Sequence, residues 1–209
     1  MAALNAAQIT CRCRKPISAE LQEDVNVETG SATIARQHRM LGMDTLEKRI
    51  ATDFSDVSCR RLGLMTEYLV ACVKKLSDEQ IWQRQGAYEN AVGNLVLHLC
   101  GNARQWIMHG VGGANDVRVR DEEFSANGGM SGPELIALFE ATMDEAKRVI
   151  AAVPAERMVE RITPQGRDVS VLEAIYQVVG HVQQHVGQII LVTKQMLAAD
   201  LDLTAPRPR

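Results

Sequence analysis

Ser170-Val-Leu-Glu-Ala-Ile-Tyr-Gln-Val-Val-Gly-His-Val-Gln-Gln-His-Val-Gly-Gln-Ile-Ile190 is the stretch of sequence that decides the fold. It opens with a Ser-x-x-Glu pattern, which is typical of a capped helix N-terminus. Apolar residues then recur every three or four positions, the period of an α-helix. Because they cover much of the helix circumference, we expect this helix, running to about Ala198, to be the most buried element of the protein.

Two histidines in this stretch, His181 and His185, are four residues apart and therefore share one face of the helix. A third, His98, lies in another apolar helical segment, Asn94-Leu-Val-Leu-His98-Leu-Cys-Gly-Asn102. If the two helices pack together, three imidazoles converge on one ion and leave its other coordination positions open, as in a catalytic zinc site. Zinc, nickel and iron all accept such a donor set.

The rest of the chain has the same helical pattern and clear helix boundaries. Capping-box sequences and apolar stripes predict long helices over residues 44–75, 90–109, 131–153 and 170–198. A loop of about twenty residues separates the second helix from the third, and a loop of this length is usually functional or mobile. The pattern predicts an all-α four-helix bundle.

A weak internal repeat supports this arrangement. Leu-Ser-Asp-Glu-Gln-Ile-Trp-Gln-Arg at 76–84 resembles Val-Pro-Ala-Glu-Arg-Met-Val-Glu-Arg at 153–161. Each copy follows a long helix and precedes a helix with histidines. Two helix pairs related by a pseudo-two-fold axis make a four-helix bundle, in which the histidine-bearing helices face each other across the core.

Composition and termini limit the domain organisation and the function. Residues 1–43 show no periodicity, and we expect them to be a disordered extension or the result of an early start codon. We expect residues 44–199 to form the bundle domain and residues 200–209 to be a disordered tail.

A net charge of -3 argues against nucleic acid as a partner. No apolar run is long enough to span a membrane and no signal peptide is evident, so we expect a cytoplasmic protein. The odd number of cysteines, five, favours reduced thiols.

Three amides are candidates for contacts around the histidines. Asn94 and Asn102 lie one turn on either side of His98 and are candidates for hydrogen bonds to the metal ligands. Gln177 lies one turn before His181, where lining a pocket and plain packing are equally supported.

Other polar side chains near the histidines have simpler interpretations. Glu122 and Glu123, in the long loop, are candidates for a base above the metal, but an exposed acidic loop is the favoured interpretation. Arg104 either holds an anionic substrate or is solvated at the surface. We interpret Cys100 as a buried core thiol and His109 as a residue at a helix end, too far from His98 to join its site.

Residues 44–197 resemble the DinB/YfiT-like family, through the two histidine-bearing segments quoted above and through Arg118-Val-Arg-Asp-Glu-Glu-Phe124. The resemblance implies an up-down-down-up four-helix bundle, often dimeric. It also implies a zinc or nickel site made by His98, His181 and His185. Characterised members of the family include enzymes that use a low-molecular-weight thiol for S-transfer or isomerisation.

Three functional hypotheses follow. The first is a divalent-metal-dependent enzyme, an S-transferase or hydrolase, in which the metal activates a thiol or water against a small-molecule substrate. The second is a non-catalytic metal-binding module of a stress response, and we expect a homodimer in either case. The third is a plain helical bundle in which the histidines are core residues.

Overall fold

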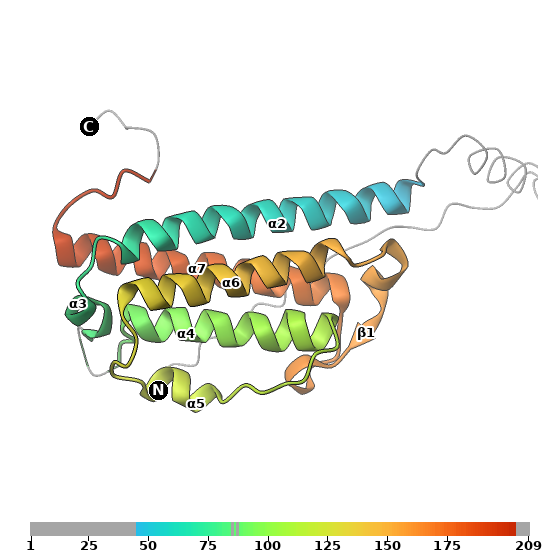
Figure 1. Ribbon diagram of the computed structural model, residues 1–209. Helices are drawn as coiled ribbons and strands as arrows, with labels where there is room; N and C mark the ends of the chain where they lie inside the picture. Colours follow the sequence, from blue (N-terminus) through green and yellow to red (C-terminus); the bar gives the residue numbers. More distant parts are fainter. Residues whose placement is uncertain (1–44, 85, 87, 204–209) are drawn as a thin grey trace, which may run out of the picture. The chain divides into compact units, whose positions relative to one another are not determined.

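Four long helices run up, down, down and up in the computed structural model, which describes residues 45–84, 86 and 88–203 (Figure 1). Their bounds are α2 Leu46–Val73, α4 Val92–Ala103, α6 Gly132–Ala151 and α7 Val171–Leu197. The all-α four-helix bundle expected from the sequence is confirmed.

The predicted capping sequences cap the helices. At the start of α7 the Ser170 hydroxyl accepts from the Glu173 backbone N–H at 3.1 Å, and the Glu173 carboxylate accepts from the Ser170 N–H at 3.2 Å. At the start of α6 the Glu134 carboxylate accepts from the Ser131 N–H at 2.7 Å. These bonds satisfy backbone donors that an isolated helix end leaves unpaired, and they fix where each helix begins.

The helices pack so that α4 and α7 are neighbours. Helix α2 contacts α6 and α7, and α4 contacts the same two helices. The histidine-bearing helices therefore face each other along a shared side of the bundle rather than through its centre. The core consists of the inward apolar stripes of the four helices, and its largest fully buried members are Phe139, Leu62, Leu69, Ile81, Leu99, Ile107, Leu135, Met143, Ile150, Ile175, Ile189 and Val73.

The second predicted helix is not α-helical throughout. Helix α4 ends at Ala103 and continues as a π-helical segment, η1, over Arg104–Val111. The backbone N–H of Gly112 donates to the carbonyl of Ile107 at 2.8 Å, five residues earlier, which widens the turn. Gly112 accommodates this turn because a Cβ there would lie 2.7 Å from the Met108 carbonyl oxygen.

Short elements connect the long helices. Helix α3, Asp78–Trp82, precedes α4, and helix α5, Arg120–Ser125, lies within the predicted long loop. The second copy of the repeat forms a 3-10 turn, η2, over Ala155–Val159. It leads into an antiparallel pair of two-residue strands that precedes α7, and these elements are β1 Arg161–Ile162, the turn η3 Pro164–Gly166 and β2 Val169–Ser170.

The ends of the predicted domain lie largely outside the described residues, and their assignment stays a prediction. The expectation for residues 1–43 lies outside the described residues, as does that for 204–209. Leu201, assigned to the tail from the sequence, is buried against the core. None of the described helices is long and apolar enough to cross a lipid bilayer.

Candidate metal centre

The imidazoles of His98, His181 and His185 converge at the α4–α7 contact. His181 Nε2 lies 3.2 Å from His98 Nε2 and 3.1 Å from His185 Nε2. Three nitrogens at zinc-bonding distance in tetrahedral geometry are roughly 3.3 Å apart. Among the described residues, these three histidines are the group of potential metal ligands whose nitrogen atoms lie close enough together to share one ion.

The register of α7 explains the burial of its two histidines. Val178, Val182 and Val186 form part of the fully buried stripe of the helix. His181 and His185 each come one residue before a member of that stripe, so their rings lie at its edge and are half-buried. His98, on α4, is 7% exposed. The cluster therefore has one buried imidazole and two that reach the bundle surface.

A carboxylate fixes the tautomer of His98. Nδ1 of His98 lies 2.9 Å from Oε2 of Glu123, in α5. Nη2 of Arg118, which only donates, lies 3.1 Å from the same Nδ1, but it has a closer acceptor in Oε2 of Glu123 at 2.8 Å. Because an ionised carboxylate only accepts hydrogen bonds, we assign the proton to Nδ1, which donates it to Glu123. The lone pair of His98 is then on Nε2, the nitrogen that points toward His181. This is the carboxylate–histidine arrangement found behind many metal ligands.

Arg118 holds that carboxylate in place and in its ionised form. Its guanidinium donates from Nε to Oε1 of Glu123 at 2.7 Å and from Nη2 to Oε2 at 2.8 Å, the two-point geometry that arginine makes best. A further bond from Nη1 to Oε1 of Gln105 measures 2.9 Å. Burial raises the pKa of Glu123, but the hydrogen bonds and charges of Arg118 and His98 outweigh it and lower the pKa below its ordinary value.

Burial favours the neutral form of His181 and His185. Burial, followed by the nearby charges of His185, His98 and Arg118, lowers the pKa of His181 to about 4. Burial also lowers the pKa of His185. Nδ1 of His185 lies 2.6 Å from Oε1 of Gln188, an amide oxygen that only accepts, so the His185 lone pair is also on Nε2.

This donor set fits a divalent cation. His98 and His185 direct Nε2 lone pairs at His181, and lone pairs that face each other repel unless a proton or a cation lies between them. His181 Nδ1 is buried and has no hydrogen-bond partner among the described residues. Metal ligation requires neutral imidazoles, and the lowered pKa values of His181 and His185 meet that requirement near neutral pH.

Sequence interpretation missed the role of Glu123 and its partner. The favoured interpretation, an exposed acidic loop, is wrong for Glu123, which is 8% exposed, and right for Glu122, which is exposed. Arg118 stood out only as part of the family-like segment. The signal that could have identified both was that segment itself, an Arg and a Glu five residues apart in a loop long enough to fold back on the His98 helix.

The three candidate amides have different surroundings. Asn94 is fully buried, and its Nδ2 donates to the carbonyls of Glu123 at 2.9 Å and Ala126 at 2.8 Å, so it attaches α5 to α4. Asn102 is buried, but its Oδ1 has no hydrogen-bond partner among the described residues. Gln177 is exposed on α7. The structure thus connects Asn94 to the histidines through α5, and shows no such connection for the other two within its described part.

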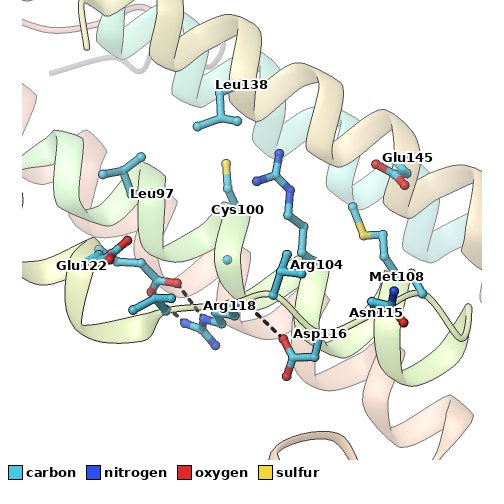
Figure 2. A pocket seen from close by; sticks show the side chains of 15 residues that line it. Leu97, Cys100, Arg104, Met108, Asn115, Asp116, Arg118, Glu122, Leu138 and Glu145 are labelled. Atoms are coloured by element: carbon cyan, nitrogen blue, oxygen red, sulfur yellow. Dashed lines mark hydrogen bonds and ion pairs between the residues drawn. The ribbon is translucent and has the colours of Figure 1, made fainter. Parts of the chain in front are cut away.

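Arg118 and Glu123 also line a cavity of about 520 Å³ (Figure 2). Its lining includes Arg104, Cys100 and Leu138, and Figure 2 shows the Cys100 thiol and the Arg104 side chain directed toward Leu138 of α6. His98, His181 and His185 are not among the residues that line this cavity.

The remaining candidates near the histidines stay outside the cluster. Cys100 is a buried core thiol, as expected, and burial raises its pKa to about 12. Arg104 is exposed at the rim of the cavity. His109 lies near the end of η1, where its Nδ1 is 2.6 Å from the carbonyl oxygen of Ala114.

Comparisons with known proteins agree with the architecture. Residues 49–209 match the profile of a family described as "Protein of unknown function (DUF1572)". A DinB-like protein from Bacillus cereus ATCC 10987 superposes with a TM-score of 0.53 at 16% identity, over 70% of this chain and 92% of that chain. A DinB-like protein from Bacillus subtilis gives 0.52 at 14% identity, over 66% and 90%. No curated protein matched. The resemblance to DinB-like proteins drawn from the sequence is confirmed.

Proposed function

Because the chain belongs to DUF1572, an uncharacterised family with the DinB-like fold, we propose its function from its own site: a divalent-metal-dependent enzyme acting on a small molecule. The observation that carries the proposal is the convergence of three imidazoles, with Nε2 of His181 3.2 Å from that of His98 and 3.1 Å from that of His185. A buried carboxylate orients His98. His98, His181 and His185 would hold the ion, with zinc or nickel favoured and iron also accepted by imidazole ligands.

Three ligands support an enzyme over a structural metal site. Structural zinc sites are closed by four protein ligands, whereas catalytic sites keep a position for substrate or water. The group found within the described residues has three members. A bound divalent ion supplies Lewis acidity at the edge where His181 and His185 reach the surface.

The protein's own residues position this chemistry. Glu123 orients His98, and Arg118 keeps Glu123 charged and in place. We place the substrate at the exposed edge of the histidine cluster, because none of the three histidines lines the 520 Å³ cavity. S-transfer with a low-molecular-weight thiol and hydrolysis are the two reactions that suit such a centre.

The first experiment is elemental analysis of untagged protein beside a His185→Ala variant and a His109→Ala control. We expect about one zinc, nickel or iron per chain in the wild type and the control, and loss of the metal in His185→Ala. The loaded protein is then assayed for thiol transfer and for hydrolysis. Metal binding without either activity would favour a non-catalytic metal-binding module. No metal in any sample, even after soaking with zinc and nickel, would overturn the proposal.

A further inference from the structure

The segment 118–126, which we call the docking arm, is attached to the bundle in part through its main chain. Asn94 of α4 donates to the carbonyls of Glu123 and Ala126. Arg84, which follows α3, donates from Nη2 to the carbonyl of Phe124 at 2.6 Å. These contacts set where the arm lies without depending on which side chains it presents.

Three side chains of the arm contact His98, and one of them is Arg118, whose Nη2 lies 3.1 Å from Nδ1 of His98. Glu123 accepts from Nδ1 at 2.9 Å, and the ring of Phe124 packs on the imidazole with a centroid distance of 4.7 Å. His98 is the one histidine of the cluster that is buried, and the arm supplies part of its cover. The position of the ring therefore depends on the arm as well as on α4.

Gly101, one turn after His98 on α4, leaves the space in which Glu123 lies. A Cβ at Gly101 would be 1.9 Å from Oε1 of Glu123, 2.8 Å from its Cδ and 3.0 Å from Nε of Arg118. No real Cβ contact is this short, so any other residue at 101 displaces the carboxylate. Because the displaced atoms are the end of a flexible side chain, the bundle can keep its fold while the contact with His98 is lost.

We propose that docking of the arm and metal binding at the three histidines strengthen each other, and that Gly101 is the positioning residue that makes this coupling possible. A cation on Nε2 polarises the Nδ1–H bond of His98 and strengthens its hydrogen bond to Glu123. By linkage, a docked arm then raises metal affinity by the same factor. This inference rests on the proposed metal site and adds its regulation by the arm.

The main test compares Gly101→Ala with Gly63→Ala, a mid-helix glycine of α2 at which a Cβ would meet nothing within 4 Å. Zinc affinity is measured by chelator competition, with circular dichroism to check the fold. We expect zinc to bind at least about 10-fold more weakly to Gly101→Ala, the usual effect of losing a contact behind a metal ligand, and unchanged affinity in Gly63→Ala. Equal affinities in both variants would overturn the inference.

A second variant, Glu123→Gln, covers the case in which Gly101→Ala does not fold. It keeps the shape of the side chain but removes its charge. We expect weaker binding and a shift in the visible absorption of the cobalt-substituted protein, because a neutral amide donates less electron density through His98. An unshifted spectrum with unchanged affinity would contradict the inference.

Hydrogen exchange reports on the arm itself. We expect zinc to slow amide exchange across 118–126 in the wild type, and to slow it less in Gly101→Ala. If zinc binds to the wild type but leaves exchange of the arm unchanged, the coupling is wrong and the metal site stands. If zinc binds to none of these proteins, the proposed function itself fails.

Discussion

At the scale of single residues, Arg118 is the side chain on which the candidate site depends most. Its side chain is 3% exposed and that of Glu123 is 9% exposed, so each of the two buried charges is stabilised chiefly by the other. We expect Arg118→Met to lower the free energy of unfolding by roughly 3 kcal/mol, because it leaves a buried carboxylate without its guanidinium partner. Arg118→Lys restores only part of the loss, since an ammonium cannot make the two-point contact. Urea denaturation measures both.

The matched control for Arg118 is Arg161→Met. Arg161 makes a similar bond to Asp168, 2.9 Å from Nε to Oδ1, but both side chains are more than half exposed. Exposed ion pairs contribute at most about 1 kcal/mol. If Arg161→Met lowered the free energy of unfolding as much as Arg118→Met, burial of the Arg118–Glu123 pair would not explain its contribution to stability.

His181 makes the stability of the metal-free protein depend on pH. Burial and neighbouring charges lower its pKa to about 4 in the folded protein, against 6.5 ordinarily. The unfolded chain therefore binds a proton more readily at this residue. The contribution of His181 to the free energy of unfolding is fully present above pH 6.5 and is lost as the pH drops from 6.5 toward 4. We expect His181→Leu to show a flatter profile over that range in urea titrations with chelator present. Parallel profiles for the two proteins would refute the assignment to His181.

The histidines were predictable from the sequence and Glu123 was not. Spacing of four residues on one apolar helix places His181 and His185 together by geometry alone. The contact of Glu123 with His98 depends on how a six-residue helix folds back across 25 residues of chain. So short an element has little periodicity of its own, and its position is set by the bonds that Asn94 makes to its carbonyls.

At the scale of elements, α7 ends in a strained residue that can be improved. Ala198 follows the helix with φ 49° and ψ 34°, a left-handed conformation that costs an alanine about 1 kcal/mol or more. We expect Ala198→Gly to stabilise the protein by up to about 1 kcal/mol, because glycine adopts this conformation freely. The thermal unfolding midpoint should rise by a few degrees.

The same substitution at the end of α6 should change the free energy of unfolding in the opposite direction. Ala152 caps that helix with φ -86° and ψ -4°, a right-handed conformation in which alanine is unstrained. Ala152→Gly is expected to destabilise by about 0.5 kcal/mol or more, through the greater freedom of glycine in the unfolded chain. Changes of the same sign at both positions would show that backbone conformation does not decide the effect.

The starts of the long helices were predictable because local side chains define them, whereas the form of the second helix was not. Ser131 and Ser170 cap α6 and α7 through glutamates three residues later, a pattern visible in the sequence. The π-helical turn of η1 appears in no local pattern. It becomes intelligible only when Gly112 is seen to approach the Met108 carbonyl closely.

At the scale of the whole molecule, the apolar stripes and caps of the four helices predicted the bundle. They did not predict which helices are neighbours, and that arrangement decides which histidines reach the surface. The sequence alone suggested that the histidine helices face each other across the core. Their actual contact, α4 beside α7, brings His181 and His185 to the bundle surface. That choice of neighbours depends on the packing of all four helices together, which no single segment encodes.

An ion at this position would join α4 to α7, so metal binding should stabilise the entire bundle. A ligand at a free concentration 100 times its dissociation constant adds about 2.7 kcal/mol to the free energy of unfolding. For a domain of this size that corresponds to a rise in the unfolding midpoint of roughly 5–10 °C, measurable by differential scanning calorimetry with and without zinc. His109→Ala should keep this rise, because His109 contacts the Ala114 carbonyl and not the cluster. His185→Ala should lose it, and an undiminished rise in that variant would show that zinc binds elsewhere on the chain.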